Sequence, residues 1–411
     1  MVKFFRIIFT ISFLYSFNIL SMIDNRFLPL YRQMYNRSSC KRSASGTELF
    51  VMFGNHAFGS DDKDIGIPEI NGQYDIIKIG KSLELIGKKN PFSTQFRVSP
   101  KLELELEGKL GVQGLWLGYE QNFYNNFSFG LSFFIMHLAS KQRFAIPKQI
   151  KEELKLTKGN EIILDKEIRE GNELLGLNIF QFSKTSPSDI DIYLRYAMIR
   201  DYIYKFRKID AGISLGFLFP AGQPVNINNP ASIPFGGDGH FGIYGLADVT
   251  FELKEDLSVG LWFEVLKRFS KNQIKRMPIN NEPLEYGAVV GEARINPGIT
   301  IGFSPFIALE DIRDGFGFKV RYTLVFHAED DWKDLRKEKK VKTDLDDVIE
   351  RSKWSSEYFI FTLMYDFAKG ATKCRKFAPI IYLEWYRPSK VFLADRSAKT
   401  NRVSFGFEFN F

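Results

Sequence analysis

Large apolar residues alternate with small or charged residues through most of the chain from about residue 95 onward. In segments 127–135, 209–219 and 316–326 every second residue is apolar, and most of the residues between them are glycine, serine or charged. A period of two over this length indicates β-strands that have one apolar face.

The length of these segments separates two all-β architectures. Strands of soluble sandwiches usually have about 5 to 6 residues, whereas a tilted strand that crosses a hydrocarbon layer about 30 Å thick needs about 9 to 11. The segments have the longer span, and aromatic residues such as Tyr119, Tyr196 and Phe219 stand near their ends, as in the interfacial girdles of membrane barrels. We expect an all-β fold, a transmembrane antiparallel up-and-down β-barrel, with a soluble sandwich as the alternative.

Twelve strands are predicted, and their connections alternate in length. The connections after the even-numbered strands are short and those after the odd-numbered strands are long, as in barrels with periplasmic turns and external loops; only the first, near Gly108–Gly111, is too short. Segments 49–53 and 74–79 are candidates for two more strands, which would make fourteen. The predicted strands are 99–108, 112–121, 127–138, 188–198, 207–219, 240–253, 257–267, 297–309, 315–327, 356–367, 377–386 and 402–411.

The last ten residues carry the most specific pattern. Large apolar residues from Val403 onward alternate with polar or small ones, and the chain stops on an aromatic residue. This resembles the C-terminal insertion signal of porin-like Gram-negative outer-membrane barrels, with Ser404, Gly406, Phe409 and Phe411 at the matching positions. The resemblance covers about three quarters of the chain and implies outer-membrane lipids and the barrel-assembly machinery as partners.

The N-terminal residues have the pattern of an export signal. Lys3 and Arg6 precede an apolar run that continues to about Ile23, which is typical of a secretory signal peptide; an uncleaved anchor helix is the alternative. We therefore divide the chain into a signal peptide (1–21), an N-terminal periplasmic segment or plug (22–94), with a short amphipathic helix at 76–86, and an outer-membrane barrel (95–411).

Composition and charge exclude several other classes. The 41 phenylalanines suit a protein whose outer surface is apolar, and much of the formal charge of +7 comes from the first 47 residues. No basic folded face is predicted, so nucleic acid is not an expected partner. The acidic run at 329–331 is interpreted as a solvated loop.

The chain has four histidines that could take part in catalysis, His56, His137, His240 and His327. None stands in a motif of the outer-membrane hydrolases, and we expect neither an enzyme nor a cofactor. The turn that contains Asp238 and His240 is interpreted as a turn only.

Charged residues opposite the apolar stripe are expected to line the lumen, because charges on the lipid side are costly. Acidic residues outnumber basic ones there, which predicts a preference for cations. The acidic residues are Glu103, Glu105, Glu107, Glu120, Asp189, Asp191, Asp210, Asp248, Glu252, Glu264, Glu384 and Glu408, and the basic residues are Lys101, Arg195, Lys208, Lys319, Arg321 and Arg402.

The two cysteines are candidates for a disulfide. Cys40 precedes the barrel and Cys374 lies in a predicted periplasmic turn, so both are expected on the oxidising side of the membrane; two free thiols are the alternative.

The function expected from these features is a porin-like channel for passive diffusion of small hydrophilic, preferentially cationic solutes. A structural or adhesive surface barrel with functional loops, and an outer-membrane hydrolase, are the alternatives. A lumen blocked by paired Arg and Glu would favour the structural barrel, and a histidine close to Ser, Asp or Asn at the outer rim would favour the hydrolase.

Overall fold

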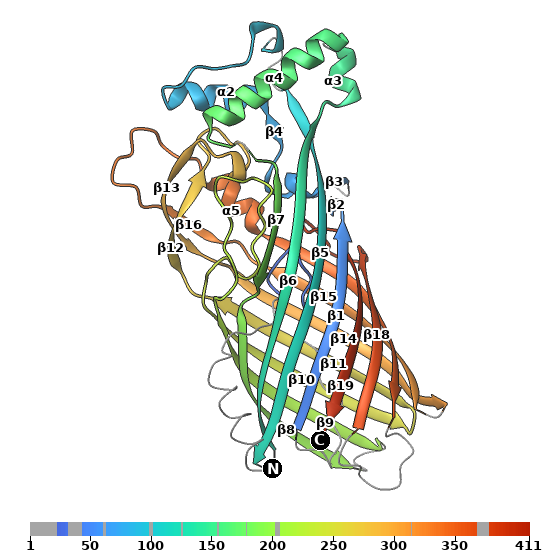
Figure 1. The fold of residues 1–411 in the computed structure, drawn as a ribbon. Helices are drawn as coiled ribbons and strands as arrows, with labels where there is room; N and C mark the ends of the chain where they lie inside the picture. Colours follow the sequence, from blue (N-terminus) through green and yellow to red (C-terminus); the bar gives the residue numbers. More distant parts are fainter. Residues whose placement is uncertain are drawn as a thin grey trace, which may run out of the picture.

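The computed structural model describes residues 23–31, 43–60, 63–97, 102–124, 126–153, 156–177, 179–201, 206–313, 315–367 and 378–411. Within them, twelve antiparallel strands form a closed barrel (Figure 1). The barrel strands are β1 (Ser43–Gly54), β5 (Glu103–Tyr124), β6 (Phe127–Ala145), β8 (Ile190–Asp201), β9 (Lys208–Phe219), β10 (Gly242–Lys254), β11 (Leu257–Arg268), β14 (Ile299–Arg313), β15 (Phe316–His327), β17 (Trp354–Asp366), β18 (Ala378–Ser389) and β19 (Asn401–Asn410).

The barrel closes between its first and last strands. β1 pairs with β19 on one side, with Leu49 opposite Phe405, and with β5 on the other, with Leu49 opposite Leu115. Around the ring the order is β5-β1-β19-β18-β17-β15-β14-β11-β10-β9-β8-β6, and β6 returns to β5. The wall therefore has no unpaired edge, which is what a sheet in hydrocarbon requires.

The number of strands agrees with the prediction, but two of the predicted strands are wrong. Residues 103–108 and segment 112–121 belong to the single 22-residue strand β5. Gly108 continues this strand, and its missing side chain leaves room for the Pro68 ring. The missing strand is β1, which contains segment 49–53. Segment 74–79 adds only the short β4 (Tyr74–Asp75) before a helix, so the barrel does not have fourteen strands.

This correction also restores the alternation of short and long connections. The end that carries Ser43 and the C-terminus has the short turns, such as residues 255–256 between β10 and β11. The long connections, now including 55–102 between β1 and β5, gather at the opposite end. With the termini taken as periplasmic, this opposite end is external.

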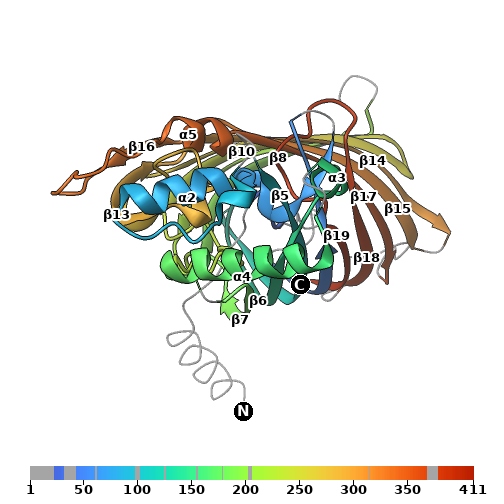
Figure 2. The same ribbon diagram turned by 90° about the horizontal axis from the view of Figure 1, so that it is seen from above.

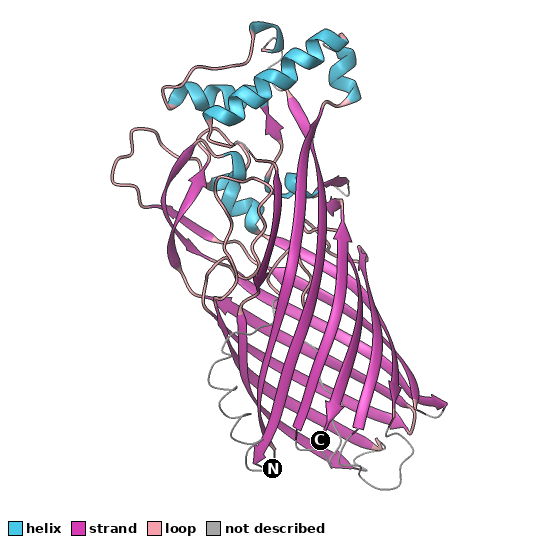
Figure 3. Ribbon diagram, in the orientation of Figure 1, coloured by secondary structure: helices cyan, strands magenta, loops and turns pink. Residues whose placement is uncertain are grey.

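The external connections form a folded cap over part of the barrel mouth (Figures 2 and 3). Leu104 and Leu106 on the extended β5 pack in one cluster with Ile79 of α2 and Leu164 of α4, which explains why the β5–β6 hairpin continues beyond the wall. The remaining elements are β2 (His56–Phe58), β3 (Asp64–Gly66), α2 (Ile76–Leu85), α3 (Lys148–Glu153), α4 (Lys158–Leu174), β7 (Gln181–Pro187), β12 (Lys271–Met277), β13 (Val289–Asn296), β16 (Asp331–Asp334), α5 (Asp346–Ser352) and three short 3₁₀ helices at Ile67–Asn71, Thr94–Phe96 and Leu284–Tyr286.

The outer surface of the barrel is apolar. Outward-facing side chains such as Leu49 (60% exposed), Ile213 (67%), Phe303, Leu383 and Phe405 are exposed although large. An exposed apolar surface of this extent needs an apolar partner, and a continuous band around a closed barrel fits the hydrocarbon layer. The fold is that of an outer-membrane β-barrel.

No helix among the described residues has the length and apolar character needed to cross a bilayer.

The domain boundaries differ from the expectation at the start of the barrel. The wall begins at Ser43, since β1 is a wall strand. The helix expected at 76–86 is α2, and it lies in the external cap. The predicted signal peptide, residues 1–21, lies outside the described residues.

Candidate functional site

The inward face of the barrel is lined by charged and aromatic side chains. The inward charged residues of the wall include Glu48 and Arg268, which the sequence pattern did not predict. The structure places these predicted residues on the inward face or at its external rim: Glu120, Asp189, Asp191, Arg195, Lys208, Asp210, Asp248, Glu252, Glu264, Lys319, Arg321, Glu384, Arg402 and Glu408.

Three predicted lumen residues lie elsewhere. Glu103, Glu105 and Glu107 stand on the part of β5 that extends beyond the wall, and Glu105 and Glu107 are exposed. Their apolar neighbours are buried under α2 and α4, so here the polar face meets the external solution. Lys101 lies outside the described residues.

Two ion pairs deep in the wall join strands that are close neighbours. Arg195 of β8 donates to Asp248 of β10 (Nε to Oδ1, 2.9 Å) and lies 3.8 Å from Asp210 of β9. Arg402 of β19 pairs with Glu48 of β1, the next strand. These pairs therefore run along the wall and do not cross the lumen.

Residues 23–31, which we call the plug segment, occupy the lumen. Leu28 and Leu30 are fully buried, and Ile23 and Tyr31 are nearly so. Leu28 and Leu30 pack in one cluster with Phe50 and Met52 of β1 and with wall residues of β5 and β6, whereas Tyr31 stacks on Tyr386 of β18 with ring centroids 6.1 Å apart. The plug segment thus contacts several sides of the barrel.

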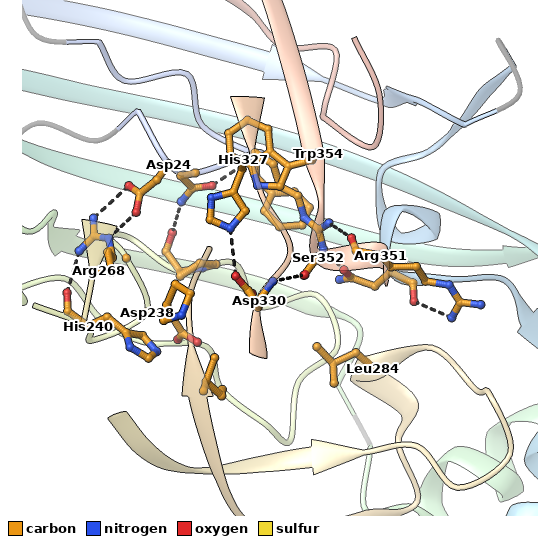
Figure 4. Close-up of a pocket in the computed structure, with 18 of the residues that line it drawn as sticks. Asp24, Asp238, His240, Arg268, Leu284, His327, Asp330, Arg351, Ser352 and Trp354 are labelled. Atoms are coloured by element: carbon orange, nitrogen blue, oxygen red, sulfur yellow. Dashed lines mark hydrogen bonds and ion pairs between the residues drawn. The ribbon is translucent and has the colours of Figure 1, made fainter. Parts of the chain in front are cut away.

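Polar contacts hold the plug segment at nearly opposite walls. Asp24 forms a bidentate ion pair with Arg268 at the external end of β11 (Nη2 to Oδ1, 3.0 Å; Figure 4). The Pro29 carbonyl accepts a hydrogen bond from Arg402 of β19 (3.4 Å), and β19 is five positions from β11 in the ring of twelve. Burial alone would raise the pKa of the Asp24 carboxyl, but the charge and hydrogen bonds of Arg268 outweigh it and hold the pKa below its ordinary value of 3.8.

The loop between β9 and β10 closes the mouth beside the plug segment. Ile233 and Phe235 are buried in the same cluster as Leu28 and Leu30. The Asp189 carboxylate accepts hydrogen bonds from the backbone N–H groups of Gly222 and Gly237 (3.3 and 2.6 Å). Asp189 also pairs with Arg268 (2.7 Å), so one guanidinium holds both closing elements.

At least two cavities adjoin the plug segment. A cavity of about 200 Å³ on its external side is lined by polar and apolar side chains, including Asp24, His240, Arg268 and Trp354 (Figure 4). Burial lowers the pKa of the His240 imidazole, which favours its neutral form. A cavity of about 30 Å³, lined by Tyr31 and Arg321, lies against β10, β11, β14 and β15, and its volume is enough for about one water molecule.

Two histidines, His327 and His137, form hydrogen bonds with hydroxyl groups. His327 forms hydrogen bonds with Thr300 Oγ1 (from Nδ1, 2.7 Å) and with Asp330 Oδ1 (from Nε2, 3.0 Å), but the hydroxyl of Thr300 is fully buried. His137 contacts the hydroxyls of Thr185 (2.9 Å) and Ser183 (3.3 Å), and no carboxylate of the described residues pairs with its ring. Neither arrangement supports hydrolysis.

No group of three or more His, Cys, Asp or Glu among the described residues is arranged to hold a metal ion. Cys40 and Cys374 lie outside the described residues, and their disulfide stays a prediction. The strand ends nearest to them are close together, because Ala44 and Ala378 both pair with Asn410.

The proposed insertion signal lies in the last wall strand. Ser404 and Gly406 face inward, whereas Phe409 and Phe411 are on the outward side of the alternation. A Cβ at Gly406 would overlap the Tyr382 ring on β18; Gly130 and Gly216 give the same space to Tyr193 and Tyr244. Glycines of the lumen wall therefore accommodate tyrosine rings from neighbouring strands.

Neither a protein-family model nor a curated protein sequence matches this chain. Solved structures with a similar fold include the COG4313 outer membrane channel from Pseudomonas putida F1 (9% identity, TM-score 0.49, 92% of this chain and 100% of that chain). Others are the transport unit of the autotransporter AIDA-I from Escherichia coli (6%, 0.40, 95% and 95%) and the NanC porin (10%, 0.32, 75% and 100%). At these identities and scores, the likenesses do not bear on what this barrel transports or binds.

Proposed function

We propose that the protein is an outer-membrane channel for small hydrophilic solutes, closed in this structure by the plug segment. The observation that carries the proposal is the contrast between the wall and the plug. The Arg195–Asp248 and Arg402–Glu48 pairs join wall strands at most two positions apart, whereas the plug segment reaches from Arg268 to Arg402, five positions apart. We infer that departure of the plug segment opens a passage along the wall.

The size of the barrel favours a narrow passage. Barrels of 16 to 18 strands leave wide aqueous channels, whereas smaller barrels are largely filled by side chains. Tyr193, Tyr244 and Tyr386 project into the lumen and are buried. We therefore infer a selective pore for small solutes.

A preference for cations follows from the inward charges. Among the described wall strands, the inward carboxylates, counted with Glu48 and without Glu103, Glu105 and Glu107, still outnumber the inward cations. A net negative field in a narrow lumen attracts cations and repels anions.

The structural or adhesive barrel is the second candidate, because the occluded lumen and the folded external cap favour it. The cap includes α2, α4 and the three-stranded sheet β12-β13-β16. Under this alternative, the plug segment would complete a permanent core and its removal would not produce a pore.

Solute flux into proteoliposomes separates the two candidates. The full chain and a variant that lacks residues 23–31 are reconstituted, and swelling is followed with uncharged solutes of increasing size. The channel proposal expects flux of small solutes through the deletion variant with a sharp cut-off in size. A folded deletion variant that admits none of them would support the structural barrel.

A further inference from the structure

Part of the external loop between β18 and β19, residues 391–393, exposes large apolar side chains. The side chains of Val391, Phe392 and Leu393 are 51%, 71% and 58% exposed. Three consecutive large apolar side chains with this exposure are costly in water.

An outward-facing carboxylate holds this part of the loop against the wall. Glu357 in β17 is on the same face of its strand as Phe359 and Leu363, yet it is fully buried. Its carboxylate accepts hydrogen bonds from the backbone N–H groups of Val391 (2.7 Å), Phe392 and Ala394 (both 3.0 Å), and also from Leu393. A charge on the lipid side of a barrel is costly, and four N–H donors satisfy it.

The loop reaches down to the level of the apolar band. The Phe392 ring lies against Tyr322 of β15, with ring centroids 6.0 Å apart. Tyr322 faces outward opposite Phe359, and two further outward apolar residues, Leu324 and Phe326, lie between it and the external end of β15. Phe392 is therefore continuous with the lipid-facing surface.

We propose that residues 391–393 insert into the outer leaflet of the membrane and contact the acyl chains, with Glu357 as the anchor that sets their depth. Two exposed cationic residues, Arg387 and Lys390, border the apolar residues on the N-terminal side. Their charge complements the anionic headgroups at a membrane surface. This inference does not depend on whether the barrel conducts.

Spin-label accessibility tests the insertion in nanodiscs of dimyristoylphosphatidylcholine with dimyristoylphosphatidylglycerol. Nitroxides are placed at residue 392 and at residue 162 by the substitutions Phe392→Cys and Ile162→Cys, in a Cys40→Ser, Cys374→Ser background. Ile162 on α4 is 72% exposed, which matches Phe392, but it lies in the external cap. A label at Leu383, on the lipid-facing surface, gives the reference for hydrocarbon.

The label at residue 392 is expected to be accessible to oxygen and protected from an aqueous nickel chelate, as at Leu383, whereas the label at residue 162 is accessible to the chelate. Adding Glu357→Ala should release the loop and make residue 392 accessible to the chelate. Equal chelate accessibility at residues 392 and 162 would overturn the proposal.

A second measurement keeps both native cysteines. Folding into vesicles of dilauroylphosphatidylcholine is measured for Phe392→Ala and for Ile162→Ala. Loss of an acyl-chain contact should lower the folding equilibrium constant of Phe392→Ala roughly tenfold, with little change for Ile162→Ala. Equal effects of the two substitutions would contradict the insertion.

Discussion

The guanidinium of Arg268 at the external end of β11 and the carboxylate of Asp24 in the plug segment form a bidentate ion pair, and neither side chain is more than 5% exposed. Arg268 also pairs with Asp189, which holds the β9–β10 loop. One wall residue thus connects the two elements that close the external mouth.

Weakening the Asp24–Arg268 ion pair should destabilise the closed position of the plug segment. Breaking a buried pair by removing one partner costs about 3–5 kcal/mol, and we expect less for Asp24→Asn because Arg268 keeps Asp189. In planar bilayers at neutral pH, Asp24→Asn should open more often than the unchanged protein. The control is Glu252→Gln, a wall carboxylate paired with Arg207 near the periplasmic end; equal opening by both variants would contradict the role of Asp24.

Low pH should destabilise the closed position of the plug segment in the unchanged protein. In the closed state the pKa of the Asp24 carboxyl lies below its ordinary value of 3.8. The stabilisation of the closed state by ionised Asp24 is therefore complete above pH 3.8 and is lost as the pH falls through the lower pKa. Burial raises the pKa of Asp189 even beside Arg268, so protonation of Asp189 favours the closed state and opposes the effect of Asp24. His327 also faces Asp24.

Opening is therefore expected to rise as the pH falls below about 4, and bilayer recordings at stepwise lower pH measure it. Asp24→Asn should show no such rise over the same range. A rise of equal size in Asp24→Asn would assign the acid response to another group.

Glycines that accommodate lumen tyrosines should be sensitive to substitution. A Cβ at Gly130 would overlap the Tyr193 ring, whereas a Cβ at the outward-facing Gly245 would meet no atom within 4 Å. Overpacking a filled site typically costs about 1–3 kcal/mol. Gly130→Ala should lower the free energy of unfolding in denaturant titrations by that amount, and Gly245→Ala should change it little; similar values for both would show that the ring moves freely.

Much of the wall could be predicted from the sequence, because a lipid-facing stripe imposes a period of two regardless of what lies inside. The strand β1 was harder to recognise. Phe50 and Met52 face inward and are apolar, because they pack on the plug segment, so both faces of β1 are apolar and the alternation disappears.

The site was only partly predictable for the same reason. A charged residue opposite an apolar stripe faces the lumen only where the stripe faces lipid, and Leu104 and Leu106 instead pack under α2 and α4. The plug segment has no periodic pattern, and its burial arises from contacts with residues hundreds of positions away, such as Pro234 and Arg402. Short-range sequence patterns do not contain such contacts.

The net negative charge of the open lumen should make the pore select cations over anions. In the variant without residues 23–31, reversal potentials in a potassium chloride gradient should indicate a preference for potassium that weakens at high salt, where the field is screened. Glu252→Gln with Glu264→Gln should reduce the preference, whereas Glu105→Gln with Glu107→Gln should not, because the latter pair lies outside the lumen. A preference for chloride would contradict the cationic channel.

Single-channel conductance of the unchanged protein and of the variant without residues 23–31 tests the central claim most directly. With folding verified for both, the account predicts a closed baseline with rare openings for the unchanged protein and stable conductance steps for the variant. If the folded variant is as silent as the unchanged protein, the lumen is not a passage that the plug segment closes.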